Sequence, residues 1–131
     1  MLGKEIGVQF TNGDRSEDNW HAKCDVAGIV LLDPENPTDT ESGYVYMSNS
    51  EVDNGMGGVY GLYFDKFGNV TNYKPSLVGT SKNCGGGHTP WNTWVSCEET
   101  LNDGQCWQID SSGKAEVTKI GGLEGGTFLN Q

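Results

Sequence analysis

The chain has 131 residues, enough for one domain with a core of its own. Its 18 acidic residues against 8 basic ones give a formal net charge of −10, and this negative field argues against nucleic acid as a partner. Hydrophobic residues make up 34% of the chain, and no run approaches the roughly 18 consecutive apolar residues that a membrane-spanning helix needs.

Short apolar or alternating runs between turn signals predict a protein built from β-strands. No window repeats apolar residues at helical spacing. Valine, isoleucine, threonine and aromatic residues, which favour strands, are concentrated in these runs. In chain order the expected strands are Ala27–Leu32, Tyr44–Ser48, Gly58–Phe64, Trp91–Ser96, Cys106–Ile109 and Ala115–Ile120. The turn signals between them are Asp33–Pro37, Asp65–Asn69, Asn102–Gly104 and Asp110–Gly113, all rich in residues that favour tight turns.

An internal repeat indicates which all-β architecture the strands form. Two D-x-x-G turns begin at Asp65 and Asp110, 45 residues apart, and the acidic strand ends Glu51 and Glu98 are 47 residues apart. A repeat of this length is typical of β-propeller blades, and a β-sandwich is the alternative. Propellers close with about four to eight blades. We therefore expect a partial propeller of two to three blades, completed by more chain or by other subunits.

The stretch 83–99, N-C-G-G-G-H-T-P-W-N-T-W-V-S-C-E-E, carries the strongest functional signal. Its glycines allow the backbone to approach a ligand or a neighbouring strand closely. Trp91 and Trp94 are expected to pack between blades. Upstream, the apolar strand that begins at Tyr44 also ends on an acidic residue, Glu51. Two strands that end in oxygen or sulfur ligands suggest a cation site.

The four cysteines leave several interpretations open. They are Cys24, Cys84, Cys97 and Cys106, none of which has CxxC spacing, and they allow three full pairings between which the sequence does not decide. A cysteine such as Cys97 can equally be a small buried hydrophobe. Paired carboxylates can equally be a solvated strand end.

The string N-C-G-G-G-x-T-P-W-x-T-W-V-S-C-E-E resembles the signature of the PhoX-like family, which comprises metal-dependent alkaline phosphatases and their relatives. The strand Tyr44–Glu51 and the segments 57–59 and 64–68 resemble it too. The resemblance runs from Ala27 to Gly126, so that residues 1–131 are expected to form a single propeller segment in which 1–26 match weakly. It implies a six-bladed propeller, an iron and calcium cluster, and hydrolysis of phosphate monoesters.

The resemblance also implies the metal ligands. It assigns Glu51 and Cys97 to the metals, with Glu98 or Glu99 as a neighbouring ligand. A cysteine bound to iron would lose its proton and bind as the thiolate. It assigns no catalytic residue. His88 is expected in a loop.

Some features depart from the family pattern. A glutamate is expected shortly after Gly125–Gly126, where this chain has Leu129. The single arginine, Arg15, lies outside the motifs, so that no arginine is available there to clamp phosphate. The family implies an exported or lumenal location, although residues 1–10 do not resemble a signal peptide.

Three functions therefore stand beside one another. The first is a metal-binding segment of a phosphatase. The second is a non-catalytic acidic subunit that docks on a larger assembly through open blade edges. The third is a secreted module stabilised by calcium.

Overall fold

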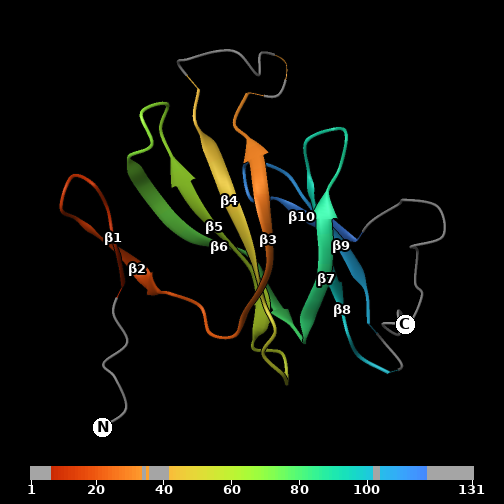
Figure 1. Ribbon diagram of the computed structural model, residues 1–131. Helices are drawn as coiled ribbons and strands as arrows, with labels where there is room; N and C mark the ends of the chain where they lie inside the picture. Colours follow the sequence, from red (N-terminus) through yellow and green to blue (C-terminus); the bar gives the residue numbers. More distant parts are fainter. Residues whose placement is uncertain (1–6, 34, 36–41, 102–103, 118–131) are drawn as a thin grey trace, which may run out of the picture.

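The computed structural model describes residues 7–33, 35, 42–101 and 104–117, and every regular element in these ranges is a β-strand (Figure 1). None of the described residues belongs to a helix long and apolar enough to cross a membrane. The strands are β1 (Gly7–Gln9), β2 (Arg15–Asn19), β3 (Cys24–Leu31), β4 (Tyr44–Ser50), β5 (Gly57–Phe64), β6 (Val70–Thr80), β7 (Asn83–His88), β8 (Trp94–Glu98), β9 (Cys106–Ile109) and β10 (Ala115–Val117).

The strands form two antiparallel meanders and a small hairpin. The first sheet has the order β3-β4-β5-β6, the second β7-β8-β9-β10, and β1 pairs with β2. Strand β3 contacts β7, so that the first strands of the two sheets lie next to each other. None of the sheets formed by the described residues is closed. Four-stranded antiparallel sheets are the units of a propeller, and the predicted all-β, partial-propeller fold is confirmed.

The predicted repeat corresponds to the same turn in both sheets. The amide of Gly68 donates to the carbonyl of Asp65, and that of Gly113 donates to the carbonyl of Asp110, both at 3.0 Å. Both glycines have positive φ, 80° and 87°, which glycine adopts without strain. Each turn joins the third strand of its sheet to the fourth, so the two sheets are built alike.

The core lies between the two sheets and contains Trp94. Its ring is 2% exposed and packs with Val45 and Met47 of β4, which are fully buried. A Cβ atom at Gly28 on β3 would lie 2.5 Å from the Trp94 ring, so that glycine is needed there for the sheets to approach. The prediction that Trp94 packs between blades is confirmed. The same prediction for Trp91 is wrong, because its side chain is 55% exposed in the turn before β8.

The strand boundaries differ from the prediction where turns or glycines intervene. The run that begins at Trp91 becomes a strand only at Trp94, because Asn92, with φ of 63°, closes a turn by donating to the carbonyl of Thr89. Strands β1, β2, β6 and β7 were not predicted. Strand β10 confirms the run after Ala115 as far as residue 117, and residues 118–120 lie outside the described part of the chain, as does the Gly125–Gly126 region.

The segment after β2 lies across the outer face of the first sheet, the face turned away from the second sheet. The imidazole of His21 is buried there, with Nδ1 at 3.0 Å from the Tyr73 hydroxyl and Nε2 at 2.9 Å from the Ser48 hydroxyl. The same ring stacks on Tyr60. Burial lowers the pKa of His21 to about 4.

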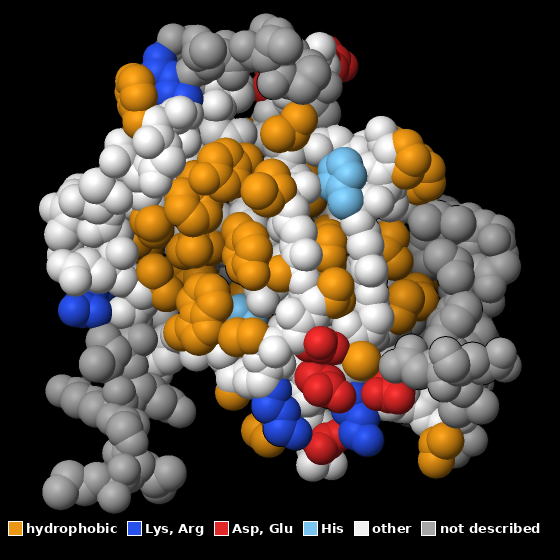
Figure 2. All heavy atoms as spheres, in the orientation of Figure 1, with side chains coloured by type: hydrophobic (Ala, Val, Ile, Leu, Met, Phe, Trp, Pro, Cys, Tyr) orange, Lys and Arg blue, Asp and Glu red, His pale blue; other side chains and the backbone are white. Residues whose placement is uncertain are grey.

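Apolar side chains cover much of the rest of this outer face (Figure 2). Ile29 and Tyr46 pair across β3 and β4 and are 48% and 36% exposed. Among the described residues, no element covers them as the second sheet covers the inner face.

Candidate metal centre

Three side chains with metal-binding atoms meet at one end of the two sheets. The antiparallel topology brings the end of β4, the start of β7 and the end of β8 to that end. Glu51 follows β4, Cys84 is the second residue of β7 and Glu99 follows β8. One ligand atom from each lies within 4.8 Å of the other two, and all three residues are half-buried. Acidic and basic side chains gather at this end, at the bottom of the view in Figure 2.

Backbone hydrogen bonds fix both glutamates. The amide of Glu51 donates to the carbonyl of Lys23 at 2.9 Å, and the amide of Glu99 donates to the carbonyl of Lys82 at 2.8 Å. Both lysines have left-handed backbones, with φ of 47° and 51°. This conformation turns the chain so that each lysine carbonyl meets a glutamate amide. The two glutamates are therefore held by main-chain contacts outside their own strands.

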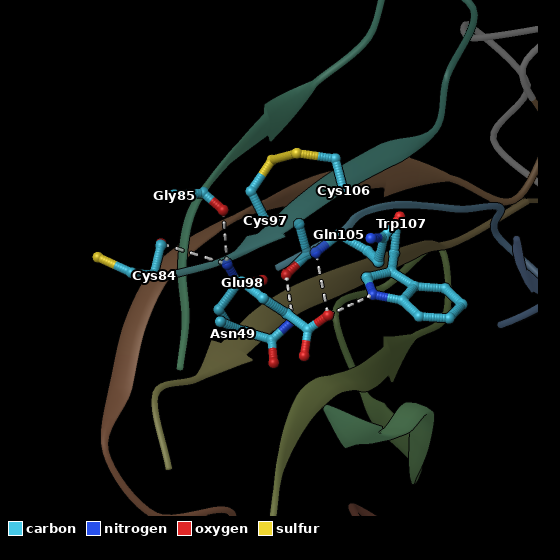
Figure 3. The surroundings of a disulfide bond; sticks show 10 residues. Asn49, Cys84, Gly85, Cys97, Glu98, Gln105, Cys106 and Trp107 are labelled. Atoms are coloured by element: carbon cyan, nitrogen blue, oxygen red, sulfur yellow. Dashed lines mark hydrogen bonds between the residues drawn. A yellow bond between two sulfur atoms is a disulfide. The ribbon is translucent and has the colours of Figure 1, made fainter. Parts of the chain in front are cut away.

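Asn49 fixes the third member of the group. Its side chain is fully buried, and its amide nitrogen donates to the carbonyls of Cys84 and Gly85 at 3.3 and 3.1 Å (Figure 3). Its oxygen accepts the Trp94 indole N–H at 2.9 Å. Gly86 lets β7 lie close to both β8 and Asn49, because a Cβ there would lie 2.4 Å from the carbonyl oxygen of Val95 and 3.3 Å from the amide nitrogen of Asn49. Asn49 thus ties the position of Cys84 to the core.

Glu98 is occupied by structural hydrogen bonds. One carboxylate oxygen accepts the Ser81 amide at 2.7 Å. The other accepts the Gln105 amide and the Trp107 indole N–H, both at 3.2 Å (Figure 3). These contacts tie the end of β8 to its neighbours, and the group formed by Glu51, Cys84 and Glu99 does not include Glu98.

Cys97 forms a disulfide with Cys106, the residue that pairs with it across β8 and β9. The side chain of Cys84 is directed away from this disulfide (Figure 3). A disulfide sulfur carries no thiolate, so the thiol beside the two glutamates belongs to Cys84, which is not disulfide-bonded. Ligation by Cys97 stays a prediction that concerns the reduced chain.

Comparison with known proteins identifies the family. The profile of the family described as alkaline phosphatase PhoX matches residues 65–130, which are 66 of the 131 residues. The chain belongs to the PhoX alkaline phosphatase family. No curated protein and no solved structure matches the chain significantly.

The PhoX match includes Cys84, Cys97, Glu98 and Glu99, whereas Glu51 precedes it. Of the four ligands expected from the sequence, the structure brings Glu51 and Glu99 together and leaves Cys97 and Glu98 in other contacts. Sequence reasoning missed Cys84. Cys84 lies near the start of β7, at the same end of the sheets as the end of β4. This position would have indicated Cys84 as a ligand only if β7 had been predicted as a strand.

The donor set in this PhoX chain fits a metal ion. Ligand atoms about 2.0–2.5 Å from one ion lie within about 5 Å of one another, and the spacing of this group satisfies that limit. Two carboxylates suit calcium or iron, whereas a thiolate favours iron, because calcium takes oxygen ligands. Three donors leave positions open for further ligands or for substrate.

Proposed function

We propose that this chain is a metal-binding segment of a phosphomonoesterase, in which Glu51, Cys84 and Glu99 hold a metal ion that takes part in cleavage of phosphate monoesters. The observation that carries the proposal is the convergence of these three side chains from three separate strands. Membership of the PhoX alkaline phosphatase family supports the reaction class. Iron and calcium, which the family resemblance implies, are the proposed ions.

The residues of this chain would have distinct roles. Glu51 and Glu99 would supply negative oxygen ligands whose backbones are fixed by hydrogen bonds at 2.9 and 2.8 Å. Cys84 would supply a thiolate held in place through Asn49. A bound metal ion would supply stabilisation of the charge on the phosphoryl oxygens and activation of an attacking oxygen. Ligands from other blades would complete the coordination, and the substrate would be a phosphate monoester.

Elemental analysis of the purified chain, combined with calorimetric titration of Ca²⁺ and of Fe²⁺ under nitrogen, tests the proposal. We expect stoichiometric metal that is lost or bound at least roughly tenfold more weakly in Glu51→Gln, Glu99→Gln and Cys84→Ala variants. Hydrolysis of a chromogenic phosphate monoester by the metal-loaded chain tests the reaction itself. A wild-type chain that takes up neither ion would overturn the proposal.

Two matched variants separate the alternative ligands. Glu98→Gln tests the neighbour of Glu99, and the double variant Cys97→Ser, Cys106→Ser tests the second cysteine of the motif without leaving the Cys106 thiol free. If Cys84 and Glu99 are the ligands, both variants retain metal. Loss of metal in either of them, with the fold intact by circular dichroism, would return Cys97 or Glu98 to the ligand set.

A second candidate function is favoured by the uncovered outer face of the first sheet. Ile29 and Tyr46 are exposed there beside the open edge of β3, which is unusual for an isolated soluble domain. The alternative is an acidic, non-catalytic subunit that packs this face against further blades or another protein. A stable stoichiometric complex without turnover would favour it, and an Ile29→Asp variant should then weaken the complex.

The proposed compartment is exported or lumenal. The disulfide between Cys97 and Cys106 supports this proposal, because such bonds persist in oxidising compartments. Thiol labelling of the protein extracted from its natural source tests it. After a chelator has removed any metal, two reactive thiols would agree with the proposal, and four in the folded chain would contradict it.

A further inference from the structure

We propose that Lys23 and Lys82 bind the phosphoryl oxygens of the substrate at the centre formed by Glu51, Cys84 and Glu99. The proposal rests on the proposed function and assigns it the phosphate-binding residues that the motifs lack. It begins from where the cationic side chains of the fold are placed.

The end of the sheets that carries the candidate centre has two cationic side chains among the described residues. Lys23 directly precedes β3 and Lys82 directly precedes β7. Other described lysines belong to the opposite end: Lys66 and Lys114 lie in or beside the D-x-x-G turns, and Lys74 donates to the carbonyl of Ser112. The arginine, Arg15, lies on β2 and donates to the carbonyl of Gly7.

The main chain couples both lysines directly to the candidate ligands. The carbonyl of Lys23 accepts the amide of Glu51, and the carbonyl of Lys82 accepts the amide of Glu99. A residue and the residue whose amide it accepts lie side by side, so each lysine flanks one glutamate. The two lysines therefore lie next to two members of the group, one before the first strand of each sheet.

Their side chains converge on a single carboxylate. The Nζ atom of Lys82 lies 3.6 Å from one oxygen of Asp53, and that of Lys23 lies 4.0 Å from the other. The side chains of Lys23, Lys82 and Asp53 are 60%, 46% and 45% exposed. Exposed ion pairs of this kind contribute little to stability. A phosphate dianion offers more charge and three or more acceptor oxygens, so it can replace Asp53 between the two ammonium groups.

The charge at this end makes the anion site depend on metal. Two lysines against Glu51, Glu98, Glu99 and Asp53 give a sum of −2, which repels phosphate. A bound divalent cation changes the sum to 0 and removes this repulsion, as does a trivalent cation bound together with a Cys84 thiolate. Phosphate binding should therefore require metal, whereas metal binding should not require the lysines.

The experiment is calorimetric titration of inorganic phosphate into the metal-loaded chain, using the ion that the wild type retains. Lys82→Gln and Lys23→Gln should each weaken phosphate binding roughly tenfold, and the double variant roughly a hundredfold. Metal affinity, titrated separately, should stay within about threefold of wild type. Lys66→Gln, at the far end, is the matched control and should bind phosphate as the wild type does.

The Asp53→Asn variant distinguishes phosphate binding by the two lysines from a merely structural role of their ion pairs with Asp53. It removes the competing carboxylate, so phosphate binding should become about three to ten times tighter. Metal uptake with unchanged phosphate affinity in the double lysine variant, or weaker binding in Asp53→Asn, would overturn this proposal alone. A wild-type chain that takes up no metal would overturn the proposed function and this proposal with it.

Discussion

Replacing Asn49 with alanine should lower the free energy of unfolding by about 3 kcal/mol. The side chain is fully buried and accepts the Trp94 indole N–H at 2.9 Å while donating to two carbonyls of β7. Alanine removes the acceptor of a buried donor, which costs about 1–3 kcal/mol. The volume lost from a closed site adds about 1 kcal/mol. This is a large share of the roughly 5–15 kcal/mol that stabilises a typical domain.

Urea unfolding followed by tryptophan fluorescence measures the loss, and a double-mutant cycle isolates its cause. Trp94→Phe removes the N–H donor, so Asn49→Ala should cost less in that background by about 1–2 kcal/mol. Asn72→Ala is the control. That side chain is exposed and accepts the neighbouring Tyr73 amide, and its removal should cost less than about 0.5 kcal/mol.

Two results would refute this reasoning. One is a loss in Asn49→Ala no larger than that in the Asn72 control. The other is strict additivity with Trp94→Phe, which would mean that the 2.9 Å contact carries no energy. Because Asn49 also holds the carbonyl of Cys84, the alanine variant should in addition bind metal more weakly.

Three further predictions concern the fold. Burial lowers the pKa of His21 from 6.5 to about 4, so folding favours the neutral ring. The free energy of unfolding should therefore be highest above pH 6.5 and fall by about 2 kcal/mol toward pH 4. Urea unfolding measures this loss, which should be absent in the His21→Gln variant. Gly28→Ala places a methyl group 2.5 Å from the buried tryptophan ring and should cost about 1–3 kcal/mol, whereas Gly87→Ala, with nothing within 4 Å, serves as the control in the same assay. Breaking the bond between Cys97 and Cys106, nine residues apart, in a double serine variant should cost about 2.5 kcal/mol by the loop-entropy relation; an unchanged unfolding midpoint in urea would contradict it.

Much of the fold could be predicted because its strands carry ordinary signals. The runs around Val45 and Val59 alternate and are rich in β-branched and aromatic residues, and the turns at Asp65 and Asp110 reveal the repeat. Strands β6 and β7 lacked such signals. Pro75 and Gly79 interrupt β6, and three glycines fill β7. Pairing with neighbours makes these segments strands, and single-sequence patterns do not contain that information.

The candidate site was only partly predictable for the same reason. Glu51, and Glu98 or Glu99, were expected as ligands because they end apolar strands and because the family resemblance implies them. Cys84 lies at the start of a strand that was not expected, so its closeness to them had no visible signal. Glu98 and Glu99 have different contacts because successive side chains along an extended chain point to opposite faces. Only the observed register shows that Glu99, and not Glu98, lies beside Glu51 and Cys84.

The placement of the candidate centre across two sheets has a consequence for how the protein is assembled. Glu51 belongs to the first sheet, whereas Cys84 and Glu99 belong to the second and lie 33 and 48 residues further along the chain. Each meander can form from local hairpins, but the full donor set exists only after the two have docked. A metal ion would therefore be acquired last, and its release would be felt first as loosening between the sheets, ahead of any unfolding within them.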